Sequence, residues 1–178
     1  FNTLSIILSD KHLAESEFSS DRKPNKIIPI NVKRKIPGQG IVKANSYESD
    51  ESGNTTENPD IVNKNTQRRI QKYKDIQQEC KKFQMIKTYG NKNAKNLIIG
   101  CRLTKTVILD AMDWDNYKFL QVLYMKPISD EIEKEIKKAN KVILVEQNVT
   151  GQLGRLIREK TGISIKNRIL KYNSRPFT

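Results

Sequence analysis

Short apolar runs and amphipathic helical patterns alternate regularly through the second half of this chain, and this alternation limits the possible folds most. The pattern predicts helices and strands in turn: strands at 97–100, 119–124, 142–145 and 163–170, and helices at 104–112, 129–138 and 150–160. Alternation of this kind gives crossover connections, so that the strands run mainly parallel. The sequence therefore predicts an α/β fold with a mainly parallel sheet and helices on both faces.

The expected helix ends carry their own residue signals. Ser129 stands before a first turn that is rich in acidic residues, and Lys137 and Lys138 fall in the last turn of the same helix. This placement of charge suits the helix dipole. Gly162 comes just after the next helix and is a plausible stop, since glycine readily adopts the left-handed conformation found there.

The segment 141–154 reads as a buried strand that leads through a polar hinge into a helix. Its apolar run at 142–145 is short and continuous, as expected for a strand that is covered on both faces. Glu146, Gln147 and Asn148 then change the chemistry abruptly, and Thr150 is a natural N-cap for the helix. Junctions of this kind are where open α/β sheets place ligands and partner contacts.

This hinge resembles a pattern in the alpha subunits of the 2-oxoacid:ferredoxin oxidoreductases, where a hydrophobic strand is followed by Val-Glu-Gln-Asn and then by Gly-Gln. Val145, Glu146, Gln147 and Asn148 match the first part of the pattern, and Gly151 and Gln152 match the second. Four further segments fall in the family's order, at 5–16, 35–40, 47–60 and 171–178. The resemblance therefore runs the length of the chain.

The resemblance implies that the chain is part of an alpha subunit. The complete complex would oxidatively decarboxylate a 2-oxoacid with coenzyme A and pass the electrons to ferredoxin. Its cofactors would be thiamine diphosphate, magnesium and an iron-sulfur cluster, whose main ligands are expected outside this chain, the diphosphate and metal sites in the partner beta subunit. The isolated chain would then have no catalytic residue, metal site or bound cofactor of its own and would be inactive.

The resemblance and the composition together divide the chain into four parts. Residues 1–17 would be the end of a truncated α/β domain of the pyrimidine-binding type, and 18–60 an extended interdomain segment. A connecting amphipathic helix is expected at 61–84, followed at 85–178 by a domain similar to the carboxyl-terminal domain of transketolase. The helix would pack within the chain through an apolar stripe: Ile70, Tyr73, Ile76, Cys80 and Phe83. We expect the chain to be a fragment of a longer subunit or a short paralogue, because the apolar strand at 4–8 has almost nothing before it.

Arg34 matches the position of a family arginine that pairs with the 2-oxoacid carboxylate, so the resemblance implies a role in substrate binding. A guanidinium offers a planar fork of donors that suits a carboxylate. The alternative is that residues 33–35 are only an exposed basic run. Nearby departures from the family pattern, with Ser49 in place of a histidine and Asn45-Ser46 in place of Thr-Gly, bear directly on whether substrate binding is retained.

Gly100 and Cys101 lie at a second junction between a strand and a helix, where backbone amides can hold an anion. A simple turn is the favoured interpretation of a lone glycine at such a place. For Glu146, Gln147, Asn148, Gly151 and Gln152 we favour a structural hinge or an interface with the beta subunit over direct catalysis. Glu146 has no second carboxylate or histidine beside it in the sequence with which to form an acid-base pair.

Charge and cysteine content test the remaining alternatives. The net charge of +13 suggests nucleic acid, but the excess lies in residues 61–178, with 25 basic and 11 acidic residues interleaved over every expected element. The main alternative function is therefore a non-catalytic scaffold module derived from the same subunit. Binding of nucleic acid is a distant third alternative. The two cysteines provide no disulfide framework, and no apolar run is long enough to cross a membrane, so we expect a cytoplasmic location.

Overall fold

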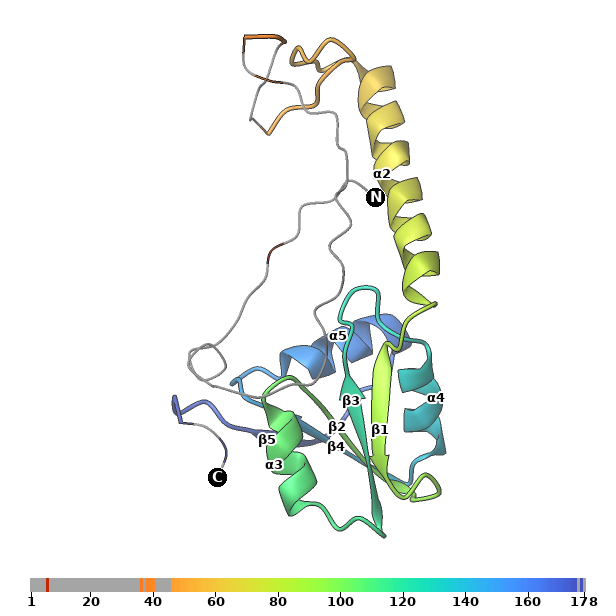
Figure 1. Ribbon diagram of the computed structural model, residues 1–178, viewed down its shortest axis with the longest axis vertical. Coiled ribbons are helices and arrows are strands. Elements are labelled where there is room, and N and C mark those ends of the chain that lie inside the picture. Colours follow the sequence, from red (N-terminus) through yellow and green to blue (C-terminus); the bar gives the residue numbers. More distant parts are fainter. Residues whose placement is uncertain (1–5, 7–35, 37, 41–45, 176, 178) are drawn as a thin grey trace, which may run out of the picture. The chain divides into compact units, whose positions relative to one another are not determined.

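The computed structural model describes residues 6, 36, 38–40, 46–175 and 177, and the chain divides into two compact units, Phe1–Lys74 and Asp75–Thr178. The elements of the described residues are labelled in Figure 1: α2 (Pro59–Cys80), β1 (Ile86–Gly90), β2 (Asn96–Cys101), α3 (Thr104–Ala111), β3 (Tyr117–Val122), α4 (Glu131–Lys138), β4 (Lys141–Glu146), α5 (Gln152–Thr161) and β5 (Asn167–Leu170).

The second unit is built on a five-stranded sheet with the order β1-β3-β2-β4-β5. β2 lies between β3 and β4 and runs parallel to both, and β5 runs parallel to β4. Only β1 is antiparallel, paired with β3 at the edge. The predicted α/β fold with a mainly parallel sheet is therefore confirmed.

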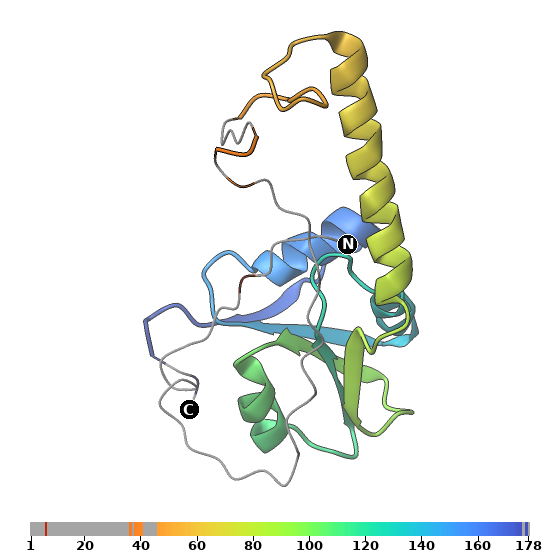
Figure 2. The same ribbon diagram turned by 45° about the horizontal axis from the view of Figure 1, so that its top comes forward.

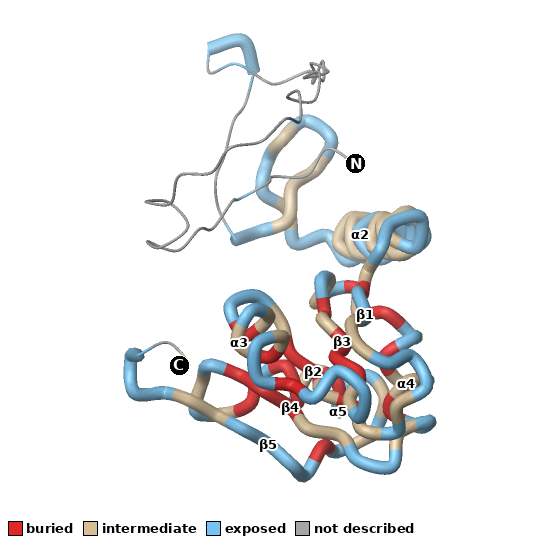
Figure 3. Tube along the Cα trace, turned by 60° about the horizontal axis from the view of Figure 1, so that its bottom comes forward, coloured by how far each residue is buried: buried red, intermediate tan, exposed pale blue. Residues whose placement is uncertain are grey.

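Helices cover both faces of this sheet, as expected (Figures 1 and 2). On one face, α4 and α5 pack on β2, β3 and β4 through buried aliphatic residues: Leu97, Ile99, Leu120, Ile132, Ile136, Leu144, Leu153 and Ile157. On the other face, Ile108 of α3 packs with Phe119 and Val145. Met112, which directly follows α3, belongs to the same buried cluster. Figure 3 shows that the buried residues gather along the central strands. Burial of both faces explains why these strands have continuous apolar runs.

At the two outer strands of the sheet, β1 and β5, the hydrophobic pattern does not predict the strands correctly. β1 was not predicted, because only Ile86 of its five residues is buried and the strand shows no continuous apolar run. β5 begins at Asn167 and not at residue 163, although Ile165 is buried before the strand starts. An edge strand has a neighbour on one side only, so its sequence is less constrained by burial.

The predicted signals at α4 and at the end of α5 are confirmed. Ser129 Oγ accepts a hydrogen bond from the amide of Glu131, with acidic residues in the first turn of α4 and Lys137 and Lys138 in the last. Gly162 adopts the left-handed conformation, with φ of 74°, and its amide bonds to the Arg158 carbonyl. This is the geometry that ends many helices.

The helix α2 begins in the first unit, where Asn58 Oδ1 accepts hydrogen bonds from the amides of Asp60 and Ile61. No residue of α2 is buried, and Phe83 lies beyond its end. The packing of the apolar stripe within the chain therefore stays a prediction. The division of the chain at residues 17, 60 and 84 also stays a proposal, as do the roles assigned to its parts.

Candidate functional site

A pocket of about 510 Å³ opens at the carboxyl ends of β2 and β4. From β2 the chain passes through α3 to β3, whereas from β4 it passes through α5 to β5 in the opposite direction along the sheet. The two loops therefore diverge, and ligands of open α/β sheets bind where the strand order reverses in this way. The pocket walls come mainly from these two loops and their helices: Cys101, Arg102, Leu103, Thr104, Glu146, Gln147, Asn148, Gln152, Leu153 and Leu156, together with Met125.

Glu146, the last residue of β4, is bound by the loop that it begins. Its Oε2 accepts hydrogen bonds from Leu153 N at 2.9 Å and from Asn148 Nδ2 at 2.7 Å. Its Oε1 accepts one from Gly154 N at 3.1 Å. A carboxylate at this place satisfies amides of the first turn of α5 and suits the positive end of the helix dipole. Glu146 is only 3% exposed and both of its oxygens are occupied, so it holds the strand and the helix together.

Asn148 completes the start of α5. Its Oδ1 accepts hydrogen bonds from the amides of Thr150, Gly151 and Gln152, the second at 2.6 Å. The expectation that Thr150 is the N-cap is wrong, because Gly151 occupies that position with a positive φ of 63° and α5 begins at Gln152. The turn that Asn148 stabilises brings the glycine into this conformation, which residues other than glycine rarely adopt.

The remaining hinge residues face outward. Gln147 Nε2 donates to the carbonyl of Arg175, which joins the hinge to the chain's end. Gln152 is exposed beside the pocket, and Val149 at the tip of the hinge is 59% exposed. Leu103, at the matching tip after β2, is 53% exposed. Apolar side chains at two neighbouring tips give this edge of the sheet a partly apolar surface.

The junction after β2 is closed by Thr104, which sequence reasoning did not single out. Thr104 Oγ1 accepts a hydrogen bond from the amide of Cys101 and donates one to the Cys101 carbonyl. The Cys101 amide is thus already used within the turn. A larger residue at Gly100 would crowd the turn, since a Cβ atom there would lie 2.7 Å from Thr104 Oγ1 and 2.8 Å from Ile108 Cδ1. The favoured interpretation, a turn, accounts for these contacts, and anion binding at this place stays a prediction.

Cys101 lies between this turn and Glu146. Burial raises the pKa of the Cys101 thiol, the negative charge of Glu146 raises it further, and Arg102 opposes both. A raised pKa disfavours the thiolate, which is the reactive form of cysteine. Arg102 lines the same pocket. Its φ is positive, at 51°, and the neighbouring residues of the sequence do not predict this left-handed conformation.

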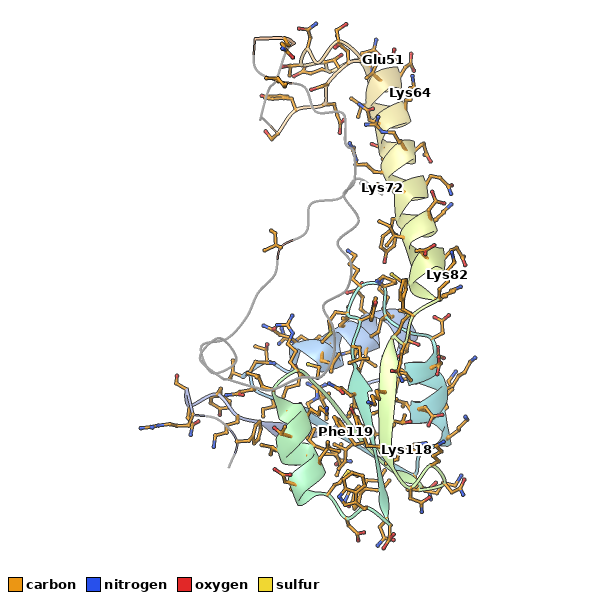
Figure 4. All side chains as sticks on the ribbon, viewed as in Figure 1. Glu51, Lys64, Lys72, Lys82, Lys118 and Phe119 are labelled. Carbon is orange, nitrogen blue, oxygen red and sulfur yellow. The ribbon has the colours of Figure 1, made fainter. Side chains whose placement is uncertain are left out.

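Arg34 and Asn45 lie outside the described residues, so the proposed carboxylate contact of Arg34 stays a prediction. Ser49 lies in a small loop in which it pairs with Thr55. In the first unit, this loop is tied to α2 by ion pairs from Glu48 to Arg69 at 2.6 Å and from Glu51 to Lys64 at 2.9 Å. Figure 4 labels Glu51 and Lys64. The hydrogen bond from Arg69 lowers the pKa of Glu48.

The described residues contain no group of three or more histidine, cysteine or acidic side chains that could hold a metal ion. Both cysteines of the chain, Cys80 and Cys101, are free. Within the same described part of the chain, no helix is long and apolar enough to span a membrane.

No family model matches the chain. Curated proteins are similar to it over most of its length. It is 30% identical over 149 residues to the alpha subunit of 2-oxoacid:ferredoxin oxidoreductase 1 from Sulfurisphaera tokodaii, a match that covers 81% of this chain and 23% of that protein. It is 28% identical to the alpha subunit of 2-oxoacid:ferredoxin oxidoreductase 2 from Aeropyrum pernix, a match that covers 99% of this chain and 32% of that protein. The chain thus spans about a quarter to a third of the length of these relatives.

Among solved structures, a 2-oxoglutarate:ferredoxin oxidoreductase from Magnetococcus marinus has a similar fold, with a TM-score of 0.65 and 22% sequence identity. The match covers 80% of this chain and 26% of that chain, and that structure contains 2-oxoglutarate, coenzyme A and succinyl-CoA. The predicted resemblance to alpha subunits of this family is confirmed by the curated relatives, and the fold by the solved structure.

Proposed function

We propose that this chain, a relative of the alpha subunits of 2-oxoacid:ferredoxin oxidoreductases, works as part of such a subunit. The complete complex would oxidatively decarboxylate a 2-oxoacid with coenzyme A and transfer electrons to ferredoxin. The observation that carries this proposal is the sequence similarity to curated alpha subunits over 81% of the chain. The similar fold of a solved oxidoreductase supports it.

Within the complex the chain acts as a scaffold. Glu146 is the acidic residue that lines the candidate pocket, it is buried, and its oxygens accept hydrogen bonds from Asn148, Leu153 and Gly154. A general base needs a free oxygen within reach of the proton that it removes. Glu146 is instead placed to fix the angle between β4 and α5, and so the shape of the pocket beside it.

The cofactors belong to the complete complex. The chain has only Cys80 and Cys101, whereas a cluster of the ferredoxin type uses four cysteine ligands. The residues of this chain therefore do not fit an iron-sulfur cluster. We propose that the ligands of the cluster, of thiamine diphosphate and of magnesium are supplied by companion chains, and that the chain alone is inactive.

The beta subunit is the partner that we propose for the carboxyl edge of the sheet. Leu103 and Val149 expose apolar side chains at the tips of the two loops that border the pocket. Exposed apolar side chains beside a concave surface are a feature of many protein contacts. Arg34 is proposed to reach the substrate carboxylate from the interdomain segment, and the complex is proposed to work in the cytoplasm.

Purification of the chain with the products of its neighbouring genes tests this function. We expect a stable complex that reduces ferredoxin only when a 2-oxoacid and coenzyme A are both supplied, and no reduction by the chain alone. A stable complex without turnover would favour the scaffold module that has lost catalysis. The absence of any complex would contradict the proposal.

A further inference from the structure

A second pocket, of about 350 Å³, lies at the amino ends of the parallel strands, at the opposite edge of the sheet from the candidate site. Four lysines and one acidic residue line it: Lys92, Lys95, Lys118, Lys138 and Glu135. They come from the turn before β2, from β3 and from α4, so the fold brings them together from distant parts of the sequence. We call this group the lysine pocket.

Lys118, labelled in Figure 4, is the most buried of these lysines. Its side chain is only 10% exposed, whereas that of Lys138 is 66% exposed. Its ammonium group forms an ion pair with Glu135 and donates a hydrogen bond of 3.4 Å to the Lys92 carbonyl. Lys138 pairs with the other oxygen of Glu135 at 3.1 Å. The hydrogen bond from Lys118 lowers the pKa of Glu135, so this carboxylate is ionised at neutral pH.

Positive charge exceeds negative charge in the lysine pocket. Glu135 balances one of the four ammonium groups, and the carbonyls at the end of α4 add about half a negative charge. Lys92 and Lys95 have no ion-pair partner among the described residues, and both are exposed to solvent at the pocket mouth. The remaining excess favours an anion that carries more than one charge.

We propose that the lysine pocket binds a compact anion of the phosphate class, with two or more negative charges. Lysine binds phosphate as a point charge, without the planar geometry that arginine prefers for carboxylates. The pocket has room for a diphosphate group, and Lys118 supplies a cation that is partly shielded from water and so attracts an anion more strongly than a surface lysine. The site is separate from the hinge and does not depend on the proposed oxidoreductase function.

Calorimetry of the full chain at low salt tests this site, with inorganic pyrophosphate and adenosine diphosphate as the two probes. The test variant is K92Q/K95Q, and the matched control is K87Q/K166Q, which removes the same charge from exposed lysines outside the pocket. Circular dichroism of each variant shows whether it is folded. We expect the test variant to bind pyrophosphate about tenfold more weakly, and the control to bind as the unchanged protein does.

The two probes distinguish the source of the phosphate. Tighter binding of adenosine diphosphate than of pyrophosphate would assign the pocket to a nucleotide, and equal or weaker binding would assign it to free phosphate. The proposal would be overturned if neither probe bound at millimolar concentration. An equal loss of affinity in the test and control variants would overturn it too, because general charge attraction would then explain the binding.

Discussion

Glu146 shows how a single residue of the family pattern can act on the fold of its own loop. Its carboxylate connects the end of β4 to the first turn of α5 across seven and eight positions of sequence, through the amides of Leu153 and Gly154. Asn148 Oδ1 accepts hydrogen bonds from the amides that precede these two, at positions 150–152. The hinge motif is thus a device for capping a helix, and this role alone is enough to require glutamate and asparagine at these positions.

Replacing Glu146 with glutamine tests this capping role. The new amide group would keep only one acceptor oxygen, and its NH2 group would face a backbone donor, so we expect a loss of about 1.5–3 kcal/mol in the free energy of unfolding. Urea denaturation of E146Q measures it. The control is E159Q, at a glutamate whose side chain is 66% exposed, for which we expect less than about 1 kcal/mol. Equal stability of the two variants would refute the capping role.

Cys101 provides a second prediction at the scale of one residue. Because burial and the charge of Glu146 raise its pKa, the thiolate fraction at pH 8 should be smaller than that of a free thiol. With Cys80 replaced by serine, the rate of alkylation by iodoacetamide should rise with pH and still be rising above pH 9, beyond the usual thiol pKa of about 8.5. A rate that levels off below pH 8 would mean that Arg102 outweighs the other two influences.

At the scale of the elements, the crowded end of β1 explains a glycine that the strand pattern ignores. Gly90 has a φ of 80°, and a Cβ atom there would lie 2.6 Å from the Tyr117 carbonyl oxygen. Gly162, at the end of α5, has a similar φ of 74° but no atom within 4 Å of the same position. The two glycines therefore separate the cost of the backbone conformation from the cost of crowding.

Alanine at each position tests that separation. We expect G162A to lower the free energy of unfolding by about 1–2 kcal/mol through backbone strain alone. G90A should add about 1–3 kcal/mol to this loss, because the carbonyl of Tyr117 belongs to a paired strand and cannot move away easily. Chemical denaturation of both variants under the same conditions provides the comparison. Equal losses would show that β1 is loosely held.

The elements that could be predicted from the sequence are those covered on both faces. β2, β3 and β4 have apolar runs because helices pack on each side, and the ends of these strands lie within two residues of where the pattern placed them. β1 has lysine and threonine in its middle, and β5 is mostly exposed, so neither has a pattern that fixes its position. Hydrophobic pattern reports burial, and burial is weakest at the edges of a sheet.

At the scale of the whole molecule, the residues at the carboxyl ends of the parallel strands could be predicted from the sequence. The contacts that these residues make with one another could not. The hinge residues could be named because they follow a buried strand and match a family pattern. The partners of Glu146, the use of Thr104 to close the turn after β2 and the lysine pocket all depend on side chains brought together by folding. Sequence spacing alone gives no measure of such distances.

The chain spans between 23% and 32% of the length of its curated relatives, and the proposed function gives it a place beside other chains in a larger assembly. The two ends of the parallel strands, which we call the carboxyl edge and the amino edge of the sheet, have different chemistry. The carboxyl edge exposes Leu103 and Val149, whereas the amino edge has the lysine pocket. We propose that the carboxyl edge docks on the beta subunit and that companion chains supply the reactive groups.

The affinity of the chain for the beta subunit of the same organism tests this claim most directly. We expect L103D/V149D to lower that affinity at least about tenfold, since charge at the centre of an apolar contact opposes burial. K92Q/K95Q, which alters the opposite edge, should bind the beta subunit as the unchanged chain does. Failure of the unchanged chain to bind, or equal binding by L103D/V149D, would contradict the account.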